Sequence, residues 1–170
     1  MQRGKTRTLG SMTTTADSPP PVLDCARVLA YAVADTSVKY VERKTLIVDG
    51  QLLGQVPRLA ICQNIGESEF MVFHCDNDWN VLGVAAGHDS IAKAKNEVER
   101  SYQGIGASWI DTAVTVAEAE AYLREQFGDD GCSFCGRMFY QVTQFFSGSN
   151  GRICDICVRK FSGLVEKEHG

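Results

Sequence analysis

The sequence predicts an α+β protein: an antiparallel sheet with helices on one face over residues 22–128, followed by a small C-terminal metal module over residues 129–170. Two observations predict the α+β domain: short strand-like runs separated by turn residues, and two amphipathic helical stretches that follow them. A third observation predicts the metal module. The last forty or so residues hold four cysteines arranged in two C-x-x-C pairs.

The strands are predicted from runs rich in β-branched and aromatic residues, bounded by turn-forming residues. Asp49-Gly50 is a tight-turn signal, and the polar residues 64–68 with Gly66 predict a hairpin loop. Gly87 is expected to break the last long strand. A short edge strand is expected at residues 109–110. The other expected strands cover residues 27–34, 38–41, 45–48, 51–56, 58–63, 69–75 and 81–85.

Two helices are predicted downstream of these strands. Ser90 can cap the first helix, and residues 115–118 (Thr-Val-Ala-Glu) form a capping box for the second, which Gly128 ends. Each helix carries a stripe of apolar residues that repeats at helical spacing, and both stripes are interpreted as facing the core. The stripes consist of Ile91, Ala94, Val98 and Tyr102 in the first helix, and of Val116, Ala119, Leu123 and Phe127 in the second.

The cysteine pairs have the spacing of a metal site. Cys132 and Cys135 are separated from Cys154 and Cys157 by residues 136–153, and four thiolates can complete a tetrahedral shell around one structural Zn²⁺. Gly136 after the first pair allows a positive φ. Two disulfides would need an oxidising compartment, and no signal peptide is visible. Four thiolates also suit an iron–sulfur or rubredoxin-like iron centre, which remains the alternative.

These residues resemble the C4 zinc-binding domain of ClpX, the unfoldase subunit of the Clp protease. The likeness covers about residues 131–166 and lies in Cys132-Ser-Phe-Cys135-Gly-Arg and Ile153-Cys154-Asp-Ile-Cys157-Val. It implies a bacterial protein with a treble-clef-like zinc fold that dimerises and binds unfolded substrates or adaptors. The chain departs from the family at residues 145–149, where no proline occurs, and at Ile156, where the family carries an acidic residue.

The resemblance does not extend to the ATPase motor. A motor of this kind needs a phosphate loop of the form G-x-x-x-x-G-K-[ST], and the sequence contains none. The zinc module is therefore interpreted as detached from its motor and joined to a different domain.

Charge and cysteine content narrow the class of protein. The formal net charge of −4 and the pI of about 5.4 argue against a general nucleic-acid-binding role, which usually shows as a basic domain. No apolar run approaches the roughly 20 residues that a membrane span needs. Cys25, Cys62 and Cys75 are interpreted as small buried thiols. A reducing cytoplasm is the expected compartment.

The first 21 residues are expected to form a disordered tail, since they are rich in Thr, Ser, Pro and basic residues and have no periodic apolar face. Gly10-Ser11-Met12 is typical of a cloning scar, which would make residues 1–11 vector-derived.

No catalytic constellation is predicted, and the protein is expected not to be an enzyme. His74 is interpreted as a sheet histidine with satisfied hydrogen bonds. His88 lies next to Asp89 and Ser90, but neighbours in sequence are no evidence for a triad, whose members are brought together by the fold.

The predicted function is that of a zinc-binding adaptor for protein partners, most simply a twofold homodimer through the zinc module. The partner surface is assigned to Phe139, Val142, Phe145 and Phe146, whose side chains exceed what one small module can bury. Docking of this surface onto the N-terminal domain of the same chain is the competing arrangement. A nucleic-acid-binding module using Arg137, Arg152, Arg159 and Lys160 is one alternative function, and an accessory or immunity factor of a bacterial toxin system is another.

Overall fold

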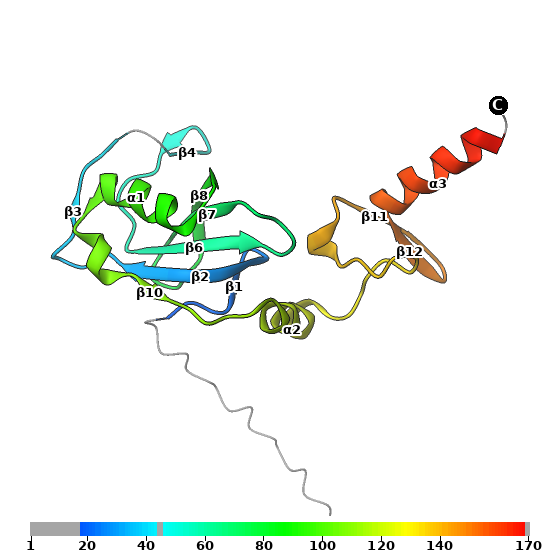
Figure 1. The fold of residues 1–170 in the computed structure, drawn as a ribbon, viewed down its shortest axis with the longest axis horizontal. Helices are drawn as coiled ribbons and strands as arrows, with labels where there is room; N and C mark the ends of the chain where they lie inside the picture. Colours follow the sequence, from blue (N-terminus) through cyan, green and yellow to red (C-terminus); the bar gives the residue numbers. More distant parts are fainter. Residues whose placement is uncertain (1–17, 44–45, 169–170) are drawn as a thin grey trace, which may run out of the picture.

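A computed structural model describes residues 18–43 and 46–168, with a curled antiparallel sheet at one end and a small cysteine-containing module at the other (Figure 1). The α+β class predicted from sequence is confirmed. Residues 1–17 of the predicted tail lie outside the described residues. The main sheet has the strand order β1-β2-β6-β7-β8, and β10 pairs with β2. Its strands are β1 (Val22–Leu23), β2 (Ala26–Val33), β6 (Arg58–Asn64), β7 (Phe70–Cys75), β8 (Val81–His88) and β10 (Ile110–Asp111).

Side chains alternate between the two faces of this sheet, and both faces hold buried residues. In β6, Leu59 and Ile61 belong to one core cluster, whereas Ala60 and Cys62 belong to another. In β2 the register with β6 shifts between Val28 and Ala30. This bulge lets one strand supply small buried residues to both clusters. The sheet therefore has no fully solvent-facing side along β2 and β6.

Helix α1 (Ile91–Ser101) covers the first face. The Ser90 side chain caps it as predicted, accepting a hydrogen bond from the Lys93 amide at 3.2 Å. Ala94 and Val98 are buried against the sheet. Tyr102, which follows the helix, is also buried, and its hydroxyl accepts a hydrogen bond from the Val56 amide at 2.9 Å. This bond ties the end of α1 to the segment that enters β6.

The second face is closed by the turn between β7 and β8. The Asp76 carboxylate accepts hydrogen bonds from the amides of Asp78 and Asn80, at 2.8 and 2.9 Å, so the turn is the Asx type that its composition predicts. The turn places Trp79 over Tyr31, with ring centroids 5.5 Å apart. The guanidinium carbon of Arg58 lies 5.0 Å from the Trp79 ring centroid. Trp79 is thus a core residue of this face.

The prediction that Gly87 breaks the last strand is wrong. β8 continues to His88, and Gly87 adopts φ +86° within it. Phe70 pairs with His88 and Val72 with Ala85, so β8 carries one residue more than β7 across this interval. A glycine with positive φ is what a bulge of this kind requires, and it bends the strand without ending the pairing.

The loop between β2 and β6 contains little regular structure. β3 (Lys39–Tyr40) pairs with β9 (Tyr102–Gln103), and β4 (Ile47–Val48) pairs with β5 (Gln51–Leu52). The predicted strand over residues 51–56 is therefore much shorter than expected. The first residue of the predicted strand at 45–48 lies outside the described part. A short 3₁₀ helix, Ile105–Ser108, precedes β10.

The sequence predicted both helices on one face of the sheet. Helix α2 (Val116–Phe127) instead packs beside β1, away from the face that α1 covers. Its capping box at Thr115 and Glu118 and its end at Gly128 are as predicted. Ala119 and Leu123 are buried with Val22 of β1. Phe139 and Tyr140 of the C-terminal module pack against the same cluster. The ring centroids of Phe127 and Phe139 lie 4.9 Å apart, so α2 is the contact between the two parts of the chain.

The C-terminal module consists of a cysteine turn, a hairpin and a helix. A 3₁₀ helix, Phe139–Gln141, leads to β11 (Phe145–Gly148), which pairs with β12 (Gly151–Cys154), and α3 (Asp155–Glu168) follows at once. α3 begins at Asp155, within the second cysteine pair. Figure 1 shows α3 pointing away from the main sheet. None of the helices in the described part is long and apolar enough for a membrane crossing.

We predict that the N-terminal domain folds without metal, because the two core clusters of its sheet contain no residue of the C-terminal module. A Cys132→Ser, Cys154→Ser double variant should keep a cooperative thermal transition in circular dichroism. Adding Ile61→Ala to that variant should reduce the free energy of unfolding by about 2–5 kcal/mol, because Ile61 is fully buried. Loss of the whole transition in the double variant would contradict the prediction.

Candidate metal centre

The first cysteine pair lies in a tight turn whose backbone orients both sulfur atoms. The Gly136 amide donates to the Cys132 carbonyl at 2.8 Å, and the Cys132 amide donates to the Arg137 carbonyl at 2.8 Å. Gly136 has φ +71°, the conformation that the sequence predicted for it. Gly131 is packed closely against this turn, since a Cβ atom there would lie 3.0 Å from the Gly136 carbonyl oxygen. Small residues on both sides therefore allow the turn to close.

The second pair lies where β12 passes into α3. Cys154 is the last residue of the strand and Cys157 is in the first turn of the helix. The Cys157 amide donates to the Cys154 sulfur at 3.4 Å, and the Cys154 amide donates to the Cys132 sulfur at 3.3 Å. The turn supplies two ligands, and the junction between the hairpin and the helix supplies the other two. This is the treble-clef-like arrangement that was expected.

The four sulfur atoms have the separations of a tetrahedral metal shell. All four lie within 4.8 Å of one another. The Cys132 and Cys157 sulfurs are 3.9 Å apart, and the Cys135 and Cys154 sulfurs are 3.7 Å apart. Zinc–sulfur bonds of about 2.3 Å give a tetrahedron with edges of about 3.8 Å. The four predicted ligands are therefore brought together at the spacing that one structural Zn²⁺ requires.

The electrostatics of the cluster also fit a cation. Burial opposes ionisation of the Cys132 thiol, but amides of Cys154, Phe134 and Cys135 outweigh it and lower its pKa to about 6. Burial and the neighbouring sulfurs raise the pKa of Cys157 to about 12. Thiolates this close repel one another, so four of them can be ionised together only around a positive ion.

Two clamps hold the hairpin and the helix in place around the sulfurs. Ser133 and Arg152 exchange hydrogen bonds: the Ser133 amide donates to the Arg152 carbonyl at 2.9 Å, and the Arg152 amide donates to the Ser133 hydroxyl at 3.1 Å. The buried Asp155 carboxylate accepts from the amides of Thr143 and Gln144 at 3.1 and 3.4 Å. Asp155 also forms an ion pair with Arg159. These bonds orient the ligand-bearing segments from outside the ligand shell.

The comparisons with known proteins agree with this geometry. The model of the ClpX C4-type zinc finger matches residues 130–167, which are the C-terminal module and a small part of the whole chain. No solved structure matches the chain. The fold and the site therefore define a zinc-binding module of the C4 type. The particular kind is the ClpX type, as the resemblance around Cys132 and Cys154 implied.

The four residues predicted to bind a partner have different places in the fold. Phe139 packs on α2, and Val142 and Phe145 are half-buried against the cysteine cluster. Phe146 is 45% exposed. Phe134, which lies between the first two cysteines, is 64% exposed. Partner binding at the four predicted residues stays a prediction, and of these four only Phe146 is among the exposed large apolar residues of the described part.

A second group of polar side chains, around His74 on β7, was missed by the sequence analysis. His74 was expected to be a satisfied sheet histidine, yet its buried Nδ1 atom has no hydrogen-bond partner among the described residues. Burial lowers the pKa of His74 to about 4. Arg43, His88 and Glu97 line the two cavities that His74 faces. Nothing in the local sequence distinguishes this histidine, because its surroundings come from α1 and distant strands.

We predict one zinc ion per chain in protein purified without chelator, measured by inductively coupled plasma mass spectrometry. Cys135→Ser and Cys154→Ser should each lower the zinc content sharply, because three thiolates leave the shell incomplete. Cys25→Ser is the matched control and should keep the zinc, since Cys25 is a free cysteine outside the cluster. Stoichiometric iron in place of zinc, or no metal, would contradict the prediction.

We also predict that His74 makes the fold sensitive to acid. Its pKa is about 4 in the folded protein and about 6.5 in an unfolded chain, so the unfolded state binds more protons between these values. The contribution of neutral His74 to the free energy of unfolding is fully present above pH 6.5. It is lost as the pH falls towards 4, by at most about 3 kcal/mol. Denaturant unfolding at several pH values should show a shallower slope for His74→Gln. Equal slopes for both proteins would refute the prediction, since thiol protonation affects both alike.

Proposed function

We propose that this protein is a non-enzymatic adaptor whose zinc module binds a protein partner. The observation that carries the proposal is an exposed apolar patch on that module, here called the α3 patch and formed by Phe134, Phe161 and Leu164. Their side chains are 64%, 38% and 52% exposed, respectively. Contiguous apolar surface of this kind on a soluble protein marks an interaction site.

The α3 patch is built from two segments that the zinc site holds together. Phe134 lies between the first two ligands, and its ring centroid is 5.4 Å from that of Phe161 on α3. Leu164 follows Phe161 by three residues, which places it on the same face of the helix. Because a ligand pair anchors each segment, zinc binding preorganises the patch, and little ordering entropy is lost when a partner binds.

A second copy of the chain is the partner that we propose. α3 projects away from the main sheet (Figure 1), so the patch is open to another molecule. A self-complementary apolar surface is closed most simply by a twofold axis. Docking of the module onto the N-terminal domain of the same chain is supported for Phe139, which packs on α2. The α3 patch has no such contact with the rest of the described chain.

The absence of catalysis is part of the proposal. Ser101 and His74 line a common cavity with Glu97, but within the described ranges no hydrogen bond joins the serine to the histidine, and His74 lacks a partner at Nδ1. A nucleophile and base of the usual kind would be hydrogen-bonded to each other and to an orienting group.

The nucleic-acid alternative has less support. Arg152 forms an ion pair with Asp130, and Arg159 with Asp155, so these cations are matched within the module. Arg137 interacts with the Cys135 sulfur. Three of the four basic residues of this alternative therefore have partners within the module, which reduces the charge available for a phosphate backbone.

The oligomeric state tests the proposal. Multi-angle light scattering of the zinc-loaded protein should give the mass of a dimer, and Phe134→Asp should give that of a monomer, because a charge on the patch would have to be desolvated in the interface. Ile110→Asp is the matched control, as Ile110 is similarly exposed on β10, and it should remain dimeric. A monomeric mass for the unchanged protein at high concentration would refute dimerisation.

A further inference from the structure

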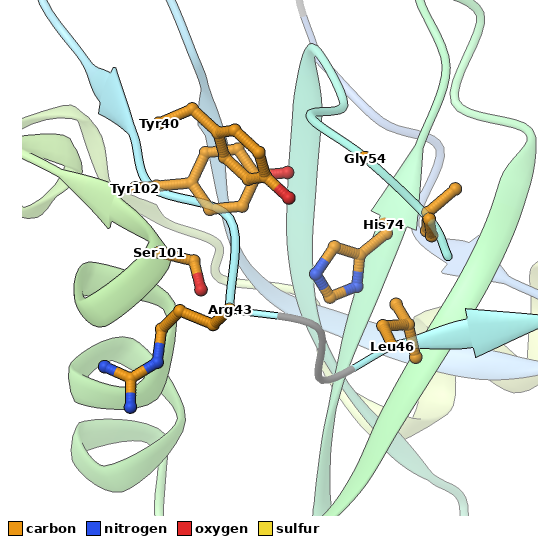
Figure 2. A pocket seen from close by; sticks show the side chains of 8 residues that line it. Tyr40, Arg43, Leu46, Gly54, His74, Ser101 and Tyr102 are labelled. Atoms are coloured by element: carbon orange, nitrogen blue, oxygen red, sulfur yellow. The ribbon is translucent and has the colours of Figure 1, made fainter. Parts of the chain in front are cut away.

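The N-terminal domain contains a cavity that the adaptor function does not use. It lies between α1 and the strands β7 and β8 and has a volume of about 110 Å³. A smaller, polar space of about 20 Å³ adjoins it and shares the lining residues Leu46, His74, Ser101 and Tyr102. Figure 2 shows the side chains around this smaller space, with the His74 ring between the tyrosines and Leu46.

His74 and His88 both line the larger space, and each has one buried imidazole nitrogen without a hydrogen-bond partner in the described part of the chain. These atoms are Nδ1 of His74 and Nε2 of His88. A buried polar atom left without a partner destabilises the fold, so such atoms are normally paired with protein, water or ligand. The strand register places the two histidines four positions apart along the sheet, with Val72 and Ala85 between them. The two imidazoles therefore lie at opposite ends of the cavity.

The polar end of the cavity is electrically neutral. Tyr40, Ser101 and Tyr102 line it together with His74, and Figure 2 shows both tyrosine hydroxyls on the His74 side of their rings. Burial keeps the His74 ring uncharged at neutral pH and raises the pKa of Tyr102 to about 12. The Tyr102 oxygen already accepts a bond from the Val56 amide, which leaves its O–H free to donate. In Figure 2 the Arg43 guanidinium is directed away from His74.

The rest of the cavity is mainly apolar and small. Val72 and Ala85 on the sheet face Val98 of α1 across it. Glu97 also lines this part, but it forms an ion pair with Arg100 at 3.0 Å. A cavity of about 150 Å³ holds benzene, so this space suits a somewhat smaller molecule. A charged ligand would have to be desolvated here without a facing opposite charge, which disfavours it.

We propose that this cavity binds a small uncharged ligand with a hydrogen-bonding head, of the primary amide class, with the head at His74 and a short apolar body against Val72 and Ala85. An amide supplies both a donor and an acceptor, which the imidazole and the hydroxyls can satisfy together. The site belongs to the N-terminal domain and would give that domain a sensing role separate from the zinc module.

The test uses three probes that share an isopropyl body and differ in the charge of the head: isobutyramide, isobutyrate and isobutylamine. Saturation-transfer NMR with the full-length, zinc-loaded protein at pH 7.5 should show saturable binding of the amide and at least tenfold weaker binding of both ions. Ala85→Leu should abolish amide binding by filling the cavity. Ala86→Leu is the matched control, because Ala86 is exposed on the opposite face of β8, and it should bind like the unchanged protein.

A second variant keeps the test decisive if Ala85→Leu fails to fold. His74→Phe preserves the ring but removes the hydrogen-bonding nitrogens, and it should weaken amide binding about three- to tenfold. Three outcomes would overturn the proposal. They are no binding of the amide, which would mean that the cavity holds only water; tighter binding of either ion; or unchanged amide binding in both the Ala85→Leu and the His74→Phe proteins.

Discussion

Four sulfur atoms gathered within 4.8 Å repel one another once they ionise, and a divalent cation removes that repulsion. The rest of the C-terminal module depends on this interaction, because so short a segment encloses few large side chains. The cysteines themselves are the centre of its core cluster, with Val142, Phe145 and Ile153 packed around them. Metal binding in such a module is therefore also its folding free energy.

Helix α2 connects the zinc module to the sheet domain. One side of it is buried with Val22 of the sheet domain, and Phe127 at its end meets Phe139 of the zinc module. The short connection that follows is held by ion pairs from Arg124 to Asp129 and from Arg152 to Asp130. These exposed pairs contribute little energy each, so the aromatic contact is the main link between the two parts.

The two proposed binding surfaces are of different physical kinds. The α3 patch is open, apolar and anchored by metal ligands, which suits a large partner that excludes water over a broad area. The cavity beside His74 is small and lined by hydroxyls and imidazoles, which suits a small molecule that satisfies specific hydrogen bonds. They share no residue, because the cavity is lined by residues between Tyr40 and Tyr102 and the α3 patch lies in the zinc module, so either can be altered by itself.

The sequence by itself determined the features whose signals are local. Two C-x-x-C pairs define the zinc ligands, Ser90 and Thr115 mark the helix starts, and a short apolar run marks the strand at residues 58–63. Each depends on residues a few positions apart, where spacing fixes geometry. The expectation for Gly87 was wrong because a positive-φ glycine serves a break and a bulge equally well, and only the pairing with Phe70 and Val72 selects the bulge.

Only the tertiary structure decided which apolar side chains remain exposed and which polar atoms remain unpaired. Phe139 and Phe134 look alike in the sequence, yet one packs on α2 and the other projects into solvent. His74 lacks a partner because β7, β8 and α1 enclose it together. Burial is a sum over contacts between segments far apart in the chain, so no local pattern encodes it.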